Sequence, residues 1–209
     1  MNEPLLEPSE PLKGGEPLWE RRLKVTTAEQ THALGAALGG VLETGDLLVL
    51  TGELGAGKTT FTQGLGEGLG VRAGIISPTF VLVRIHPNLP DGPRPGGPDL
   101  VHVDAYRLES AAEIDDIDLE NTMDSSVTVV EWGRDRVEHL SDSRLEVDLH
   151  RSVGAEGVVP AIHVEDSGTV LDFDTDDDDE PRTIIFRGFG PRWAEAPKLL
   201  ETTISEGGH

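Results

Sequence analysis

The chain has 209 residues, no cysteine and a formal net charge of −22. The lack of cysteine excludes disulfides and thiolate metal sites. The acidic charge argues against direct binding to a nucleic-acid backbone, because the phosphates would be repelled. The N-terminus lacks the pattern of a signal peptide and no apolar run reaches about 18 residues, so we expect a cytoplasmic protein without a membrane span.

The first 20 residues are rich in proline and glutamate and predict a disordered acidic tail, followed by a single domain over residues 21–209. A short strand is expected at 22–26. Thr26 and Glu29 have the spacing of a capping box and predict the start of a helix, which Gly45 should end. Its apolar positions recur at helical spacing: Ala33, Leu34, Ala37, Leu38, Val41 and Leu42.

The next segment, "TGELGAGKTT" at 51–60, follows an apolar strand at 46–50 and precedes a helix expected to reach about Leu69. It fits the pattern G-x-x-x-x-G-K-[ST]. Such glycines let successive backbone N–H groups point inward as an anion nest, and the helix N-terminus adds positive charge. Lys58 would reach the β- and γ-phosphates, and Thr59 would bind Mg²⁺. The spacing therefore predicts a nucleotide-binding P-loop.

The remaining elements predict an α/β domain. Strand-like runs occupy 77–86, 100–108, 126–132, 144–150 and 182–190, with helical character at 109–123 and a terminal helix at 192–204. A flexible Pro/Gly loop in which nothing can pack is expected at 87–99, and a flexible acidic insertion at 151–181. This order predicts a P-loop NTPase-like fold, with a mostly parallel sheet flanked by helices and added C-terminal strands.

Asp104 and Glu131 are the candidate metal-handling carboxylates. Each ends an apolar strand, and the carboxyl ends of parallel strands meet at the edge that carries the P-loop. Either residue could hold Mg²⁺ or orient the attacking water, and the sequence leaves this choice open. Trp132 fits a position beside the site or in the core. Residues Ser77, Pro78 and Thr79 lie where P-loop proteins often sense the γ-phosphate, with a plain turn as the alternative.

The absence of N-K-x-D and LSGGQ motifs favours ATP over the GTPase and ABC-type alternatives. Hydrolysis by Lys58, Asp104 and Glu131 should be slow in isolation, since no arginine finger is evident in cis. Two other functions stay open at this point: a small-molecule kinase, although no arginine-rich lid is clear, and a nucleotide-gated binding module that barely hydrolyses ATP.

Four blocks, "TGELGAGKTTFTQGLGEGLGV", "SPTF", "VDAYRL" and "VVEWG", resemble the TsaE family, the ATPase components of the bacterial machinery that makes threonylcarbamoyl-adenosine in tRNA. The resemblance extends from about Thr26 to Gly133. It implies partners similar to TsaD and TsaB, with the ATPase needed for turnover. The tail, the 87–99 loop and the 151–181 insertion depart from the family pattern.

The resemblance also implies roles for particular residues. Thr59 and Glu131 would hold Mg²⁺, and Asp104 would be the second acidic residue, needed for hydrolysis. Residues 77–79 would form a mobile switch. The remaining positions implied at the nucleotide are Glu53, Leu54, Gly55, Ala56, Gly57, Lys58, Thr59 and Thr60 in the loop, with Thr27 and Arg182 nearby.

Overall fold

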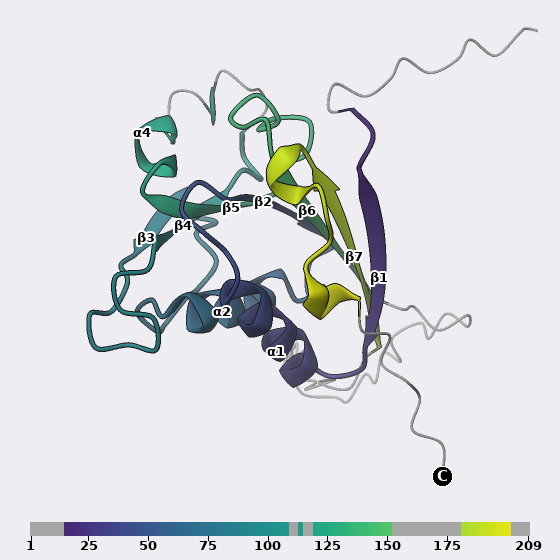
Figure 1. Cartoon of the computed structure of the whole chain (residues 1–209), viewed down its shortest axis with the longest axis horizontal. Helices are drawn as coiled ribbons and strands as arrows, with labels where there is room; N and C mark the ends of the chain where they lie inside the picture. The colour runs from purple at the N-terminus through teal and green to yellow at the C-terminus, as the bar shows by residue number, and fades with distance from the viewer. Residues whose placement is uncertain (1–14, 109–112, 115–118, 152–180, 202–209) are drawn as a thin grey trace, which may run out of the picture.

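The computed structural model describes residues 15–108, 113–114, 119–151 and 181–201. Within these ranges, seven strands form a single sheet in the order β1-β7-β6-β2-β5-β4-β3. The sheet separates the paired helices α1 (Ala28–Gly39) and α2 (Lys58–Leu69) from the short helix α4 (Glu120–Met123), as Figure 1 shows. The strands are β1 (Trp19–Val25), β2 (Leu47–Gly52), β3 (Val83–His86), β4 (Asp99–Asp104), β5 (Ser126–Glu131), β6 (Arg144–Arg151) and β7 (Arg182–Phe189).

The centre of the sheet is parallel and its margins are antiparallel. β6, β2, β5 and β4 run in parallel as neighbours, whereas β7, β1 and β3 join in antiparallel pairs. The predicted α/β P-loop fold with added C-terminal strands is therefore confirmed, and its parallel part is confined to these four central strands. The run predicted at 77–86 pairs only from Val83, because the preceding residues form a turn.

Helix α1 (Ala28–Gly39) begins one residue later than the capping-box prediction. The cap is Thr27, whose hydroxyl accepts from Gln30 N, while Gln30 Oε1 accepts from Thr26 N at 2.8 Å. The helix also ends at Gly39, well before Gly45. Its buried positions are Thr31, Gly35, Leu38 and Gly39, so the predicted apolar face is rotated from the true one.

Small residues explain that rotation. α1 packs against α2 (Lys58–Leu69), and a Cβ on Gly35 or Gly39 would overlap the carbonyl oxygen of Phe61 or Leu65. The two helix backbones therefore approach more closely than side chains would allow. The end of α2 at Leu69 agrees with the prediction. One core cluster fills the space between these helices and the sheet, and includes Leu48, Leu50, Phe61, Leu65 and Phe186.

The opposite face of the sheet holds a second core, formed by Val49, Val103, Val130, Ile114 and Val137 among others. Further along this face, the charged residues Glu146 and Asp148 are buried on β6 and pair with Arg134, Arg144 and Arg187. Each buried carboxylate thus has a cationic partner, which limits its desolvation cost.

Three sequence-based boundaries need correction. The predicted strand at 22–26 starts at Trp19, inside the predicted 1–20 tail, because Trp19–Val25 pairs with β7. Only residues 15 onward in that tail are described. Over residues 192–201, the predicted terminal helix is replaced by two 3-10 turns, Pro191–Trp193 and Lys198–Leu200, and Pro197 between them has an extended backbone; residues 202–204 of the prediction lie outside the described ranges.

The loop at 87–99 is held in place, contrary to the expectation that nothing in it packs. Arg94 Nη1 donates to the carbonyls of Leu42 and Gly39, at 2.7 and 3.2 Å. Asn88 donates to Leu69 O, and its backbone N–H donates to Asp99. Most of the predicted insertion at 151–181 lies outside the described residues.

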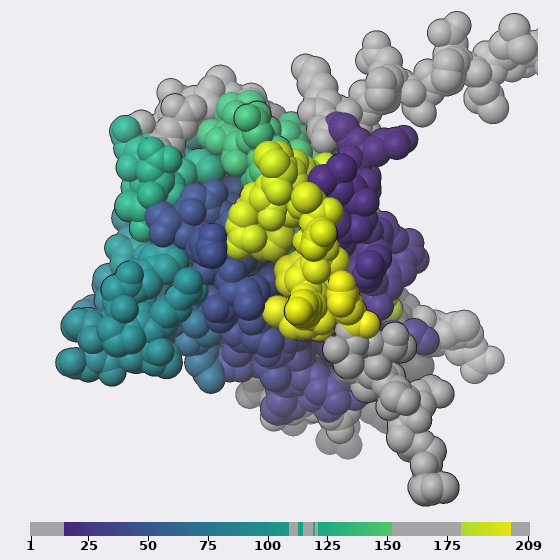
Figure 2. Space-filling model, viewed as in Figure 1, coloured from purple at the N-terminus to yellow at the C-terminus, as the bar shows by residue number. Residues whose placement is uncertain are grey.

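The C-terminal turns close the molecule against its first half, as Figure 2 shows for the yellow segment beside the purple one. Trp19 Nε1 donates to Trp193 O at 2.7 Å, and Arg192 donates to both carboxylate oxygens of Asp46 at 2.9 and 3.0 Å. No helix in the described ranges has the length and apolarity needed to cross a bilayer.

Candidate functional site: a P-loop beside two carboxylates

The P-loop follows β2 directly, and its backbone conformation is that of an anion cradle. Gly55 has φ 78° and Gly57 has φ 97°, a region that other residues rarely adopt, so glycine is required at both. Gly57 caps α2 without a side chain, which leaves the first N–H groups of the helix directed at the loop. Thr59 is half-buried on the first turn of α2.

Lys58 lies folded onto the loop. Its Nζ donates to Gly52 O at 2.8 Å and Glu53 O at 3.1 Å, and lies 4.5 Å from the ring centroid of Trp132. Burial lowers the pKa of Lys58, and the charges of Glu131 and Asp104 oppose that shift in part. Lys58 is therefore a buried cation held by carbonyl dipoles and an aromatic face, within the field of both candidate carboxylates.

Asp104 and Glu131 occupy opposing positions at the ends of β4 and β5, as the parallel-edge argument predicts. Both are buried, with 3% exposure each. Glu131 is also the register partner of Leu50 on β2, two residues before Gly52, the first glycine of the P-loop. The sheet thus brings the two carboxylates and the phosphate cradle to one edge.

The predicted switch residues bind one of these carboxylates. Thr79 Oγ1 donates to Asp104 Oδ2 at 2.6 Å, and Ser77 Oγ lies 3.4 Å from the same oxygen. The buried Pro78 supplies the carbonyl that accepts from the N–H groups of Val81 and Leu82. Through these hydrogen bonds, the 77–79 segment is attached to Asp104, one of the two buried carboxylates.

Arg182, expected near the nucleotide, lies beside the P-loop: its Nε is 3.7 Å from the position that a Cβ on Gly57 would occupy. Thr27 lies one helical turn before Thr31, whose methyl group is 3.6 Å from that same position. Glu53 and Leu54 are exposed at the tip of the loop, and Leu54 is 92% exposed. Ala56 is buried beneath it.

Two residues near the site were missed by sequence reasoning. His102 binds Glu131 through Nε2–Oε1 at 2.8 Å. Arg151 is the register partner of Arg182, and its Nη1 lies 3.6 Å from the position of a Cβ on Gly55. For His102, the signal was its place two residues before Asp104, on the same face of the strand. No local pattern in the sequence marks Arg151, because its register partner Arg182 lies about 30 residues further along the chain.

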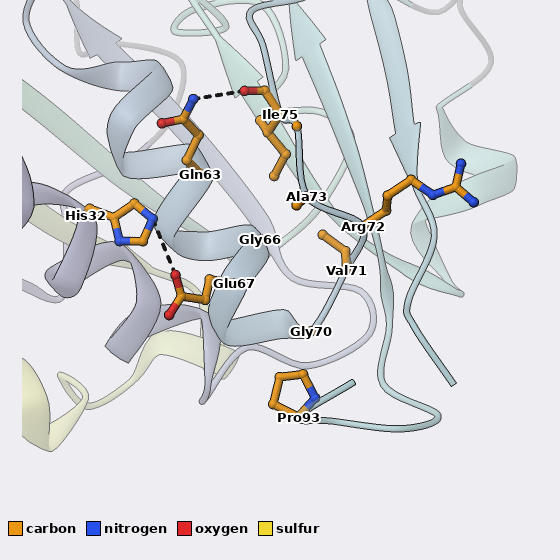
Figure 3. Close-up of a pocket in the computed structure, with 11 residues that line it drawn as sticks. His32, Gln63, Gly66, Glu67, Gly70, Val71, Arg72, Ala73, Ile75 and Pro93 are labelled. Atoms are coloured by element: carbon orange, nitrogen blue, oxygen red, sulfur yellow. Dashed lines mark hydrogen bonds and ion pairs between the residues drawn. The ribbon is translucent and has the colours of Figure 1, made fainter. Parts of the chain in front are cut away.

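A separate pocket of about 360 Å³ lies along the C-terminal half of α2 (Figure 3). His32 Nε2 lies 3.5 Å from a carboxylate oxygen of Glu67 beside it, and Gln63 donates to Ile75 O across one wall. The residues of α2 that line this pocket run from Gln63 to Gly70, about 8–18 Å along the helix from Lys58, and none belongs to the P-loop. The pocket is thus distinct from the phosphate cradle.

The fold and the site define a P-loop nucleotide-binding protein of the α/β class. Residues 25–156 match the family TsaE, described as threonylcarbamoyl adenosine biosynthesis protein TsaE. The chain belongs to the TsaE family.

Individual relatives agree with this assignment. The chain is similar to the tRNA threonylcarbamoyladenosine biosynthesis protein TsaE of Streptomyces coelicolor, with 47% identity over 78% of this chain and 93% of that protein. It is 36% identical to the TsaE protein of Bacillus subtilis, over 62% of this chain and 77% of that protein. Its structure resembles the crystal structure of Bacillus subtilis YdiB, with TM-score 0.57 and 27% identity, covering 88% and 93% of the two chains.

Proposed function

We propose that this chain is an Mg²⁺-dependent ATPase required for the threonylcarbamoyladenosine modification of tRNA, working in the cytoplasm. The observation that carries the ATPase proposal is the pair Asp104 and Glu131, which oppose each other at the sheet edge beside Lys58. The pathway is proposed from the names of the family and of its relatives.

In this proposal the loop residues 53–60 bind the phosphates of ATP, and Arg182 and Thr27 lie beside the nucleotide. Lys58 exchanges its two carbonyl partners for the β- and γ-phosphates. Thr59 and one carboxylate hold Mg²⁺, which neutralises charge on the phosphates when bound. Following the family resemblance, we propose Glu131 as the metal ligand. Asp104 is the second acidic residue and orients water or metal.

The residue set fits a metal that is bound largely by phosphate. The described residues include no group of three or more His, Cys, Asp and Glu side chains that could bind a metal ion by itself. Mg²⁺ keeps several waters and needs only one or two protein carboxylates when it bridges phosphates. The paired carboxylates and Thr59 meet that lower requirement.

Partner proteins similar to TsaD and TsaB are the proposed context of hydrolysis. Support comes from apolar side chains that surround the site and remain exposed, which we call the switch rim: Leu54, Phe80, Val81 and Tyr106, at 92%, 86%, 52% and 64% exposure. Exposed apolar surface of this kind favours docking of another protein. Contact there would reach the 77–79 segment, which Asp104 holds through Thr79.

Direct binding of tRNA is not part of the proposal, because the chain carries a net charge of −22. Fluorescence anisotropy of labelled tRNA should stay unchanged when the chain is added to micromolar concentrations at low salt. Salt-dependent binding would show that a local basic surface overcomes the net charge and would contradict this part of the proposal.

The ATPase is tested by measuring phosphate release from Mg²⁺-ATP by the full chain, alone and with TsaD- and TsaB-like proteins. We expect slow release alone and faster release with partners. A phosphorylated acceptor, sought by mass spectrometry, would identify a kinase instead. A single turnover that stays negligible with partners present would identify a nucleotide-gated binding module.

A further inference from the structure

His102 is a fully buried histidine in contact with the candidate catalytic carboxylate. It lies on β4 with 0% exposure, and its Nε2 is 2.8 Å from Oε1 of Glu131, which is 3% exposed. A hydrogen bond between two such groups is shielded from water, so it restrains side-chain rotation more than a surface contact would.

Strand register explains why these two side chains meet. Asp104 opposes Glu131, and His102 lies two residues earlier on β4, opposite Val129. Side chains two residues apart share a face of a strand, so all three polar groups lie on the face that carries α2. The diagonal placement brings the imidazole to the side of Glu131 nearer the sheet interior, away from the strand end.

The surroundings also identify the tautomer. His102 Nδ1 is buried and has no hydrogen-bond partner among the described residues. A proton on Nδ1 would be a buried donor without an acceptor, and an unprotonated Nε2 would face a carboxylate oxygen. A proton on Nε2 alone avoids both costs. His102 then donates to Glu131 Oε1.

We propose that His102 is the positioning residue of this site: its Nε2–H holds Oε1 of Glu131, fixing the plane of the carboxylate so that its other oxygen serves metal or water. This inference rests on the ATPase proposed above. Carboxylate ligands in metal sites are held by such hydrogen bonds, and losing one costs about 10–100-fold in activity or metal affinity.

Two substitutions separate positioning from a purely structural role. His102→Leu keeps an apolar volume and removes the donor, whereas His102→Gln keeps an N–H near the place of Nε2. We expect His102→Leu to lower kcat for phosphate release about 10–100-fold with little change in the KM for ATP, and His102→Gln to recover most of the loss. His86→Leu is the matched control, because His86 is a second buried histidine, 6.5 Å from His102 between ring centroids, and its Nε2 has no hydrogen-bond partner among the described residues.

Ring NMR gives a readout that needs no activity. Long-range ¹H–¹⁵N spectra of the native chain, with His102 assigned from the His102→Gln spectrum, should show a proton on Nε2 and none on Nδ1. A proton on Nδ1 alone would overturn the proposal, as would an unchanged kcat in His102→Leu or an equal loss in His102→Gln. If His102→Leu does not fold, His102→Gln and the ring spectrum still decide. If the native chain releases no phosphate, the ATPase proposal fails, while the spectrum still tests the His102–Glu131 bond.

Discussion

At the scale of single residues, Lys58 is a buried cation at the centre of the P-loop. Its ammonium group is buried and donates to two carbonyl oxygens. The negative charges of Glu131 and Asp104 favour the protonated form and so oppose the lowering of its pKa by burial. Because its folded pKa lies below the unfolded value, the folded chain binds fewer protons between those two values. The free energy of unfolding therefore rises with pH through that window, so the buried charge costs stability below it.

Replacing Lys58 with alanine should abolish tight ATP binding. Hydrogen bonds from a charged group contribute about 1.5–3 kcal/mol each, so the loss of two should weaken binding roughly 100-fold or more. Calorimetry with ATP and Mg²⁺ measures the change. Lys24→Ala, at an exposed lysine of β1, is the control. Unchanged affinity in Lys58→Ala would refute the assignment of the P-loop as the phosphate cradle.

Replacing Glu131 with alanine should separate binding from turnover. The P-loop contacts to phosphate remain, so ATP affinity should fall less than about 10-fold, whereas phosphate release should drop at least about 100-fold. Asp104→Asn is the matched variant on the opposing strand position. Near-normal turnover in Glu131→Ala would move the metal or water role to Asp104.

At the scale of elements, the sequence predicted those features that depend on residues close together in the chain. The P-loop, β2 and the end of α2 at Leu69 follow from spacing and an apolar run. The buried face of α1 was not predictable from apolar spacing. It contains Gly35 and Gly39, which lie on that face because they allow the backbone of α2 to approach closely. The His102–Glu131 and Arg151–Arg182 pairs depend on strand register, which a single sequence does not give.

The C-terminal turns are held by an ion pair between Arg192 and Asp46, a distant contact that helical spacing in the sequence does not reveal. Arg192 binds both oxygens of Asp46, while burial raises the pKa of that carboxyl despite the arginine. Arg192→Ala should lower the free energy of unfolding by about 1–3 kcal/mol, since it leaves the buried Oδ1 of Asp46 without a donor, while Oδ2 keeps the N–H of Glu43. Denaturant unfolding at neutral pH measures the loss, and exposed Arg21→Ala should change stability by less than about 0.5 kcal/mol.

The pH dependence of that loss has a defined sign. Removing Arg192 raises the folded pKa of Asp46 further, so the penalty is present above that pKa, where the buried carboxylate is charged. As the pH falls through it, the carboxyl takes up a proton and the difference from the native chain should shrink. A difference that grows toward acid pH would rule out Asp46 as the partner that matters.

At the scale of the whole molecule, a parallel nucleotide-binding centre is closed on one side by antiparallel strands from the two ends of the chain. β7 lies between β6 and β1, and β1 is the outermost strand on that side. The P-loop touches this addition through Arg182 at the start of β7. The added strand β7 therefore places the side chain of Arg182 next to the P-loop.

The limit of the N-terminal tail gives a final test of this architecture. Leu18 N donates to Gly188 O, and Trp19 Nε1 donates to Trp193 O, so the ordered domain begins before residue 20. Deleting residues 1–14 should leave Tm and phosphate release unchanged. Trp19→Ala should cost about 2 kcal/mol, roughly 4–8 °C in Tm, because this half-buried ring packs on Gly188 and anchors the C-terminal turns. A large loss from the 1–14 deletion, or none from Trp19→Ala, would move the start of the domain.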